Sequence, residues 1–179
     1  MRNRLSVVCK NGVGFLLSAT VIWMIILALF MSSLDITVKN IGTLWATGLM
    51  FPVAILFSKL IQAEWKASDN PIGQLGFIAN LAQLMYFPIL AWAFLKSPEQ
   101  LVLFFAIVTG AHFFPYGWVY NTKAYYVMAP VMAVTLIVVG WEGGSESLWR
   151  IPLVMVISLA VLNAWLWVDY KKKSQLDAG

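Results

Sequence analysis

Charge is what this sequence has least of. Of its 179 residues, 12 are Lys or Arg and 8 are Asp or Glu, so charged side chains make up only 11%. A soluble domain carries about 25% charged residues. A surface this poor in charge is not suited to water, which excludes an ordinary soluble domain. The net charge of +4 does not indicate a nucleic-acid partner, because the basic residues stand at the ends of predicted helices.

Cysteine and histidine are almost absent, each being represented once, by Cys9 and His112. One cysteine cannot form an intrachain disulfide, and no Cys/His cluster is available to hold a metal. No charged residue falls at the centre of a predicted span, so the paired carboxylates of acid–base catalysis and the buried charges of ion pumps are also missing. The sequence therefore favours a protein that is not an enzyme, with no catalytic residue, metal site or cofactor.

Long apolar runs are what the sequence does contain. Hydrophobic residues make up 61% of the chain, and the mean hydropathy is +0.80. A helix needs roughly 20 apolar residues to cross a bilayer, and six segments qualify: 12–32, 41–61, 73–95, 100–120, 124–141 and 148–168. The first is too long for a cleaved signal peptide. We expect an all-α integral membrane protein, a six-transmembrane-helix bundle forming one domain over residues 1–179.

The basic residues predict how this bundle is oriented. With the N-terminus inside, nine fall in cytoplasmic segments, namely Arg2, Arg4, Lys10, Lys59, Lys66, Lys123, Lys171, Lys172 and Lys173, against Lys39, Lys96 and Arg150 outside. Cytoplasmic loops carry an excess of Lys and Arg. The distribution predicts a multi-pass protein of the cell inner (plasma) membrane with both termini cytoplasmic.

Uncharged polar residues form stripes on two neighbouring predicted helices. On 100–120, the residues Thr109, His112, Tyr116 and Tyr120 recur at i, i+3, i+7 and i+11, which places them on one helix face. On 73–95, a similar stripe contains Asn80 and Gln83, and Asn163 lies at a comparable depth on the last helix. We expect these side chains to line a polar pocket in the cytoplasmic half of the bundle.

A predicted hinge lies beside the histidine. Pro115 removes one helical hydrogen bond and kinks the helix, and Gly117 adds conformational slack. A purely structural interpretation of the polar stripes also stays open. In it, Asn80, Gln83 and Asn163 hydrogen-bond from helix to helix, each contact contributing about 0.6–2 kcal/mol.

Residues 110–118, Gly-Ala-His-Phe-Phe-Pro-Tyr-Gly-Trp, are the most distinctive run, and a short Asn-Thr-Lys turn at 121–123 and Ala-Tyr-Tyr at 124–126 follow them. This segment resembles an uncharacterised family of small six-helix bacterial inner-membrane proteins. The resemblance implies a bacterial inner-membrane location, and it brings no activity and no residue roles.

Two functions are compatible with these features. The first is a transporter, channel or ligand-binding protein for a small uncharged or zwitterionic solute, held in the cytoplasm-facing pocket. The alternative is a non-transporting accessory subunit or a sensor of lipid or membrane state, whose polar groups pair with one another. Besides the lipid bilayer, a homo-oligomer is a further expected partner, because Gly14 and Ser18 have the spacing of close helix packing.

Overall fold

The structure, a computed structural model, describes residues 1–66 and 70–177, and this part of the chain is helical without strands. The main helices are α1 (Arg2–Val8), α2 (Val13–Met31), α3 (Ile36–Gly48), α4 (Met50–Leu60), α5 (Pro71–Ala82), α6 (Phe87–Lys96), α7 (Leu101–Ala111), α8 (Tyr116–Val119), α9 (Lys123–Glu142) and α10 (Arg150–Asp177). Short 3-10 helices are η1 (Lys10–Gly12), η2 (Gln83–Tyr86), η3 (Pro98–Gln100) and η4 (Ser145–Ser147). The predicted all-α class is confirmed.

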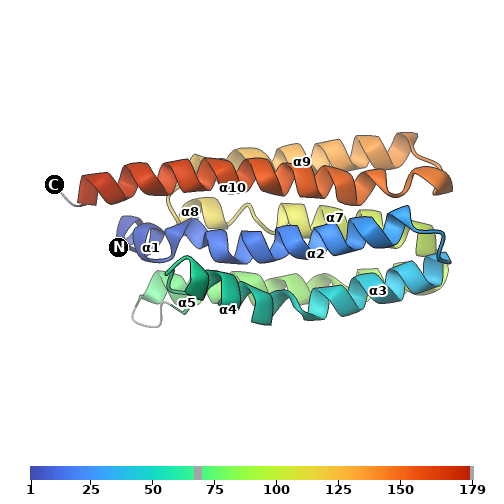
Figure 1. The fold of residues 1–179 in the computed structure, drawn as a ribbon, viewed down its shortest axis with the longest axis horizontal. Helices are drawn as coiled ribbons and strands as arrows, with labels where there is room; N and C mark the ends of the chain where they lie inside the picture. Colours follow the sequence, from blue (N-terminus) through green and yellow to red (C-terminus); the bar gives the residue numbers. More distant parts are fainter. Residues whose placement is uncertain (67–69, 178–179) are drawn as a thin grey trace.

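The long helices run side by side along the molecule (Figure 1). Among the described residues, five helical stretches are long and apolar enough to cross a membrane, and there are six if α3 and α4, bent by 44°, count as one. These lengths are compatible with a multi-pass membrane protein.

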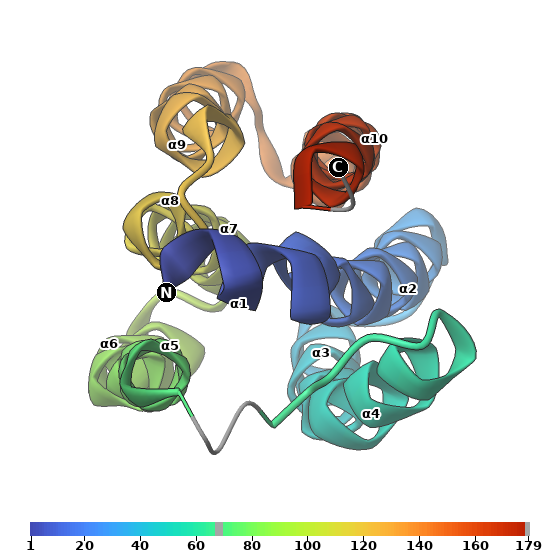
Figure 2. The same ribbon diagram turned by 90° about the vertical axis from the view of Figure 1, so that its left-hand side faces the viewer.

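Seen from one end, α2 and α7 form a middle layer, with α9 and α10 on one side of it and the α3–α4 and α5–α6 pairs on the other (Figure 2). The second helix packs against α3, α4 and α10, whereas α7 packs against α6, α9 and α10. Helix α5 packs on α1 and α8, and α6, which continues the same segment, packs on α7. Both ends of the described chain lie at the same end of the bundle, and α1 crosses that end between α8 and α2 (Figures 1 and 2).

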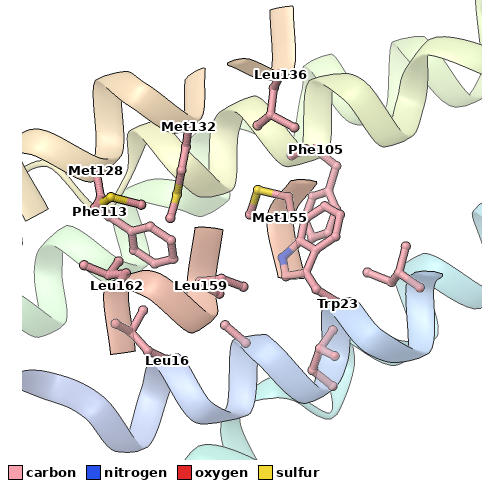
Figure 3. Close-up of a cluster of buried hydrophobic side chains, with 14 of the residues drawn as sticks. Leu16, Trp23, Phe105, Phe113, Met128, Met132, Leu136, Met155, Leu159 and Leu162 are labelled. Carbon is pink, nitrogen blue, oxygen red and sulfur yellow. The ribbon is translucent and has the colours of Figure 1, made fainter. Parts of the chain in front are cut away.

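The core joins α2, α7, α9 and α10 (Figure 3). Its labelled members are Leu16, Trp23, Phe105, Phe113, Met128, Met132, Leu136, Met155, Leu159 and Leu162. The rings of Trp23 and Phe105 stack with centroids 5.3 Å apart. These two residues lie near the middle of their helices, so their stack joins α2 and α7 near mid-length.

Side-chain caps set several helix starts. The carboxylate of Asp35 accepts from the N–H of Thr37 at 2.8 Å, and the amide oxygen of Asn70 accepts from Ile72 at 3.0 Å. Such caps satisfy amide groups that a first helical turn leaves without partners. The predicted start at residue 41 was therefore wrong, because the Asp35 cap begins α3 at Ile36.

The predicted ends of two other segments also need correction. The last helix was expected to stop at residue 168 but continues to Asp177, and its extension carries the Asp169–Lys173 ion pair at 2.6 Å. The first segment was expected to begin at residue 12, and α1 was missed. A short polar helix with basic residues has no apolar signal that a search for spans would find.

Prolines accompany the breaks inside three predicted helices. A proline has no N–H to donate and its ring pushes the preceding turn away. The 41–61 segment bends at Leu49, three residues before Pro52. The 73–95 segment becomes the 3-10 helix η2 just before Pro88. The 100–120 segment leaves α-helical geometry after Ala111 and resumes after Pro115. The sequence predicts a kink only at Pro115, and it gives no break in the 41–61 and 73–95 segments.

Candidate functional site

A cavity of about 650 Å³ lies inside the half of the bundle nearest the chain termini. Pockets for small molecules typically have volumes of roughly 300–1,000 Å³. Six of the predicted pocket residues line it together, namely Asn80, Gln83, Thr109, His112, Tyr116 and Tyr120. Most of the remaining lining is aliphatic or aromatic, so the cavity is an apolar chamber that contains a few polar groups.

The first helix closes this cavity at the end of the bundle. Leu5, Cys9 and Gly12 line it and are buried. Leu5 and Cys9 pack with Val119 of α8, and Ile72 of α5 joins this cluster. In Figure 2, α1 lies across the end of the bundle. The element that sequence reasoning missed therefore supplies one wall of the candidate site.

The opposite wall belongs to the packed core. Trp23 and Phe105 line the cavity and also stack on each other in the core (Figure 3). Trp23 is 2% exposed. The cavity therefore ends near the middle of the bundle, where these two rings meet.

His112 stands where α7 ends. Its Nδ1 lies 3.2 Å from the carbonyl oxygen of Thr109, and its ring is flanked by Phe113 and Tyr116 at centroid distances of 5.0 and 5.4 Å. The break in the helix leaves the Thr109 carbonyl available for this contact. The N–H of Phe113 donates to the carbonyl of Gly110 instead of that of Thr109, which would be its partner in a continuous α-helix. The other ring nitrogen, Nε2, is buried and has no hydrogen-bond partner among the described residues.

Asn80 on α5 and Gln83 on η2 reach the cavity from the facing side. Both are half-buried, and neither side chain makes a hydrogen bond within residues 1–66 and 70–177. Each amide offers a donor and an acceptor. Together with Nε2 of His112, they give the cavity hydrogen-bonding capacity that the described protein does not use.

Two hydroxyl groups of the stripe, those of Tyr116 and Thr109, are already engaged. Tyr116 donates to the carbonyl of Gly76 at 3.1 Å and so ties α8 to α5. Thr109 donates to the carbonyl of Phe105 on its own helix at 2.8 Å. Tyr120 stacks between Tyr116 and Tyr125 with centroids 6.1 and 6.2 Å apart. These residues shape the wall, whereas the amides and His112 keep free polar atoms.

Asn163 does not join the other pocket residues. Its amide nitrogen donates to the hydroxyl of Thr20 at 3.1 Å and to the carbonyl of Leu159 at 2.9 Å, so it links α10 to α2. It is not among the residues that line the cavity. For this residue, the structure has the helix-to-helix contact that the alternative interpretation described.

The predicted hinge residues have structural roles beside His112. Pro115 is the N-cap of α8. Gly117 is buried, and a Cβ there would lie 2.8 Å from the ring of Tyr126. The glycine therefore gives room for an aromatic ring from α9. No group of three His, Cys, Asp or Glu side chains that could hold a metal occurs in the described ranges.

Comparison with known protein families shows to which family the chain belongs. A family model described as a family of unknown function (DUF7010) matches residues 1–169. The chain belongs to this family. No curated protein and no solved structure matches it. The matched residues include all elements that line the cavity, from α1 to Tyr125 on α9.

Several wall residues of this family member were not predicted from its sequence. Gly48 has no role assigned from the sequence, and it lines the cavity together with Trp23, which also stacks on Phe105. One signal for α1 was present: Asn11 and Gly12 have φ values of 55° and 78°. Asn and Gly are the residues that adopt such left-handed conformations most readily, so an Asn-Gly pair after Lys10 indicates a turn between two helices.

The thiol of Cys9 gives a chemical test of the closed end. Burial, assisted by the negative charge of Glu64, raises its pKa to about 12. Only the thiolate is alkylated. At pH 8, iodoacetamide is therefore expected to modify Cys9 at least about tenfold more slowly in the folded protein than after unfolding in SDS.

Alkylation can be followed by mass spectrometry of the intact chain. The rate in the folded protein should keep rising with pH above 9.0, the ordinary pKa of the thiol. Equal rates in folded and unfolded samples would show that α1 does not protect this residue.

Proposed function

We propose that this chain is a multi-pass membrane protein that binds a small molecule without net charge in the cavity around His112. The observation that carries the proposal is the free hydrogen-bonding capacity of three side chains inside one chamber, Asn80, Gln83 and Nε2 of His112. A buried polar atom without a partner costs about 1–3 kcal/mol. Of the three, Nε2 of His112 is the buried atom, and a bound molecule that pairs with it would remove that cost.

The lining residues support a ligand without net charge. Among the described residues that line the cavity, Lys66 is the one with a charged side chain. It follows α4, at the end of the bundle where the chain termini lie. An ionised group buried near His112 would have no partner of opposite charge there, and such burial is very unfavourable. Uncharged molecules therefore suit the chamber, and a zwitterion suits it only if its charges are paired with each other.

We further propose that the protein spans a bacterial inner membrane with both termini in the cytoplasm. Nine basic residues against three support this orientation. The two ends of the described chain lie at one end of the bundle (Figure 1), as an even number of crossings requires. The cavity would then lie in the cytoplasmic half of the membrane, and the bacterial location rests on the resemblance of residues 110–126.

Native mass spectrometry of the protein released from nanodiscs tests the binding step. We expect the wild-type protein to carry a discrete additional mass. His112→Phe keeps the aromatic ring but removes Nε2, and it should raise the Kd about tenfold, since 1.4 kcal/mol corresponds to a factor of ten. At ligand concentrations below the wild-type Kd, the occupied fraction should fall by about the same factor. Asn80→Leu should act in the same direction.

Asn163→Leu is the matched control, because it also removes a polar side chain from a helix but lies outside the cavity. It should keep the wild-type occupancy. Absence of a bound mass in the wild-type protein, or equal occupancy in His112→Phe and Asn163→Leu, would refute the proposal.

A further inference from the structure

One side of the cavity has exposed lining residues. Phe51 on α4, Ile78 on α5 and Leu84 on η2 line it and are 42, 59 and 50% exposed, whereas Leu5 at the α1 wall is 2% exposed. We call these three residues, together with Gly48, which also lines the cavity and is exposed, the mouth. Helix α4 packs on α2 and α3, whereas α5 packs on α1 and α8. In Figure 2, the α3–α4 and α5–α6 pairs stand apart on the same side of the molecule. The cavity therefore opens sideways.

The position of the mouth along the helices determines what it faces. Gly48 lines the cavity beside Phe51 and is exposed. It lies twelve residues from Ile36 and twelve from Leu60, the two ends of the bent α3–α4 pair. At 1.5 Å per residue this is about 18 Å from either end, which is the middle of a hydrocarbon core about 30 Å thick. In a bilayer, the mouth would face lipid chains rather than water.

The tautomer of His112 determines which head group fits inside. A carbonyl oxygen only accepts hydrogen bonds, so Nδ1, at 3.2 Å from the Thr109 carbonyl, carries the proton. In the uncharged imidazole, Nε2 is then an acceptor. It needs a donor from the ligand, such as a hydroxyl group. Asn80 and Gln83 can pair with either a donor or an acceptor.

From these features we infer that the ligand is an uncharged amphiphile with a hydroxyl head, which enters from the bilayer through the mouth. The head lies between His112 and the two amides, and the apolar tail passes Phe51 and Ile78 into the surrounding lipid. This inference rests on the proposed function, because it names the ligand class of the same cavity. It differs from a water-soluble solute in both the route of entry and the need for a tail.

The probe is a photoreactive monoacylglycerol whose diazirine lies at the start of the tail, next to the head group, and it is added to the wild-type protein in nanodiscs. We expect cross-links on the cavity wall near Trp23 and Phe105, which are buried from bulk lipid. Unlabelled 1-monooleoylglycerol should suppress them at least tenfold better than its dimethyl ether, which has the same tail but no hydroxyl donor. The factor corresponds to one donor lost to a buried acceptor.

Two variants test the route and the head separately. A Cβ at Gly48 or at Gly144 would meet nothing within 4 Å, so a side chain can begin at either site without a clash at its first atom. Gly48→Trp at the mouth should reduce wall labelling at least fivefold, whereas Gly144→Trp, in the turn before η4, should leave it unchanged. His112→Phe should make the two competitors equally effective.

Labelling confined to exposed residues such as Val134 and Ile157 would overturn the inference. So would equal competition by the alcohol and its ether in the wild-type protein, a result that depends on no variant. Competition by free glycerol, together with a bound mass that His112→Phe loses, would reject the amphiphile but keep the proposed function. Neither a bound mass nor wall labelling would reject both.

Discussion

Replacement of Asn11 by alanine is expected to lower the free energy of unfolding by about 3–6 kcal/mol. Asn11 is fully buried, and its amide nitrogen donates to the carbonyl of Leu166 at 2.9 Å and to the carboxylate of Asp169 at 3.0 Å. Its amide oxygen accepts from Ser6. The change removes one hydrogen bond to a charged group and two to neutral groups. Reversible unfolding in SDS-containing mixed micelles measures the loss.

The backbone at Asn11 adds a second, separable contribution. Its φ of 55° is left-handed, which an alanine adopts at a cost of about 1 kcal/mol or more. Asn11→Gly removes the same side-chain hydrogen bonds but relieves this strain, so it should be more stable than Asn11→Ala by about 1 kcal/mol. Asn3→Ala is the surface control: it removes one exposed contact with Asn121 and should cost less than 1 kcal/mol. An Asn11→Ala variant as stable as Asn3→Ala would contradict this account.

A substitution at Gly14 should have the second large effect. A Cβ there would lie 2.2 Å from Oγ of Ser58 and 3.0 Å from its Cα and N. The hydroxyl can rotate away, but the backbone of α4 cannot, so α2 and α4 must separate. Gly14→Ala should cost about 2–3 kcal/mol, at the upper part of the usual range for overpacking. Gly14→Leu should prevent the two helices from packing.

Gly48 supplies the matched control for Gly14. It also lies in this region of the bundle, yet an added Cβ there meets nothing within 4 Å. Gly48→Ala should therefore change the free energy of unfolding by less than about 1 kcal/mol in the same SDS titration. Combining Gly14→Ala with Ser58→Ala should recover only part of the loss, because the backbone contacts remain. Full recovery, or equal stability of Gly14→Ala and Gly48→Ala, would show that the close approach of α2 and α4 does not determine the free energy of unfolding.

The helical class could be predicted from the sequence because crossing a bilayer imposes a length. About 20 apolar residues in succession are hard to explain otherwise. Where α-helical geometry breaks was less predictable. Pro52, Pro88 and Pro115 each accompany a break, but Pro130 lies inside the uninterrupted α9. A proline shows where a helical hydrogen bond is missing, and the packing around it decides whether the helix continues.

The candidate site was predictable to the extent that helix periodicity determines it. His112 and the two amides of Asn80 and Gln83 lie on stripes of neighbouring helices, and they meet in one cavity. The partner of Asn163 could not be predicted, because Thr20 is 143 residues away and no pattern connects the two helices. The α1 wall was missed for a related reason. It is held by contacts of Lys173 with Ser6 and with the carbonyls of Tyr120 and Asn121, which join distant segments.

The polar contacts of Asn11 also determine the order in which the molecule can be completed during synthesis. Its partner Asp169 follows it by 158 residues. Ribosomes add about 5–20 residues per second, so Asn11 waits roughly 8–30 s for this partner. During that time α1 lacks its contacts with α10, although Leu5 and Cys9 can already pack on Val119 and the Val8 carbonyl can accept from Glu64. The first helix to be made is therefore among the last to gain all of its contacts, and the wall that it gives the chamber is complete only near the end of synthesis.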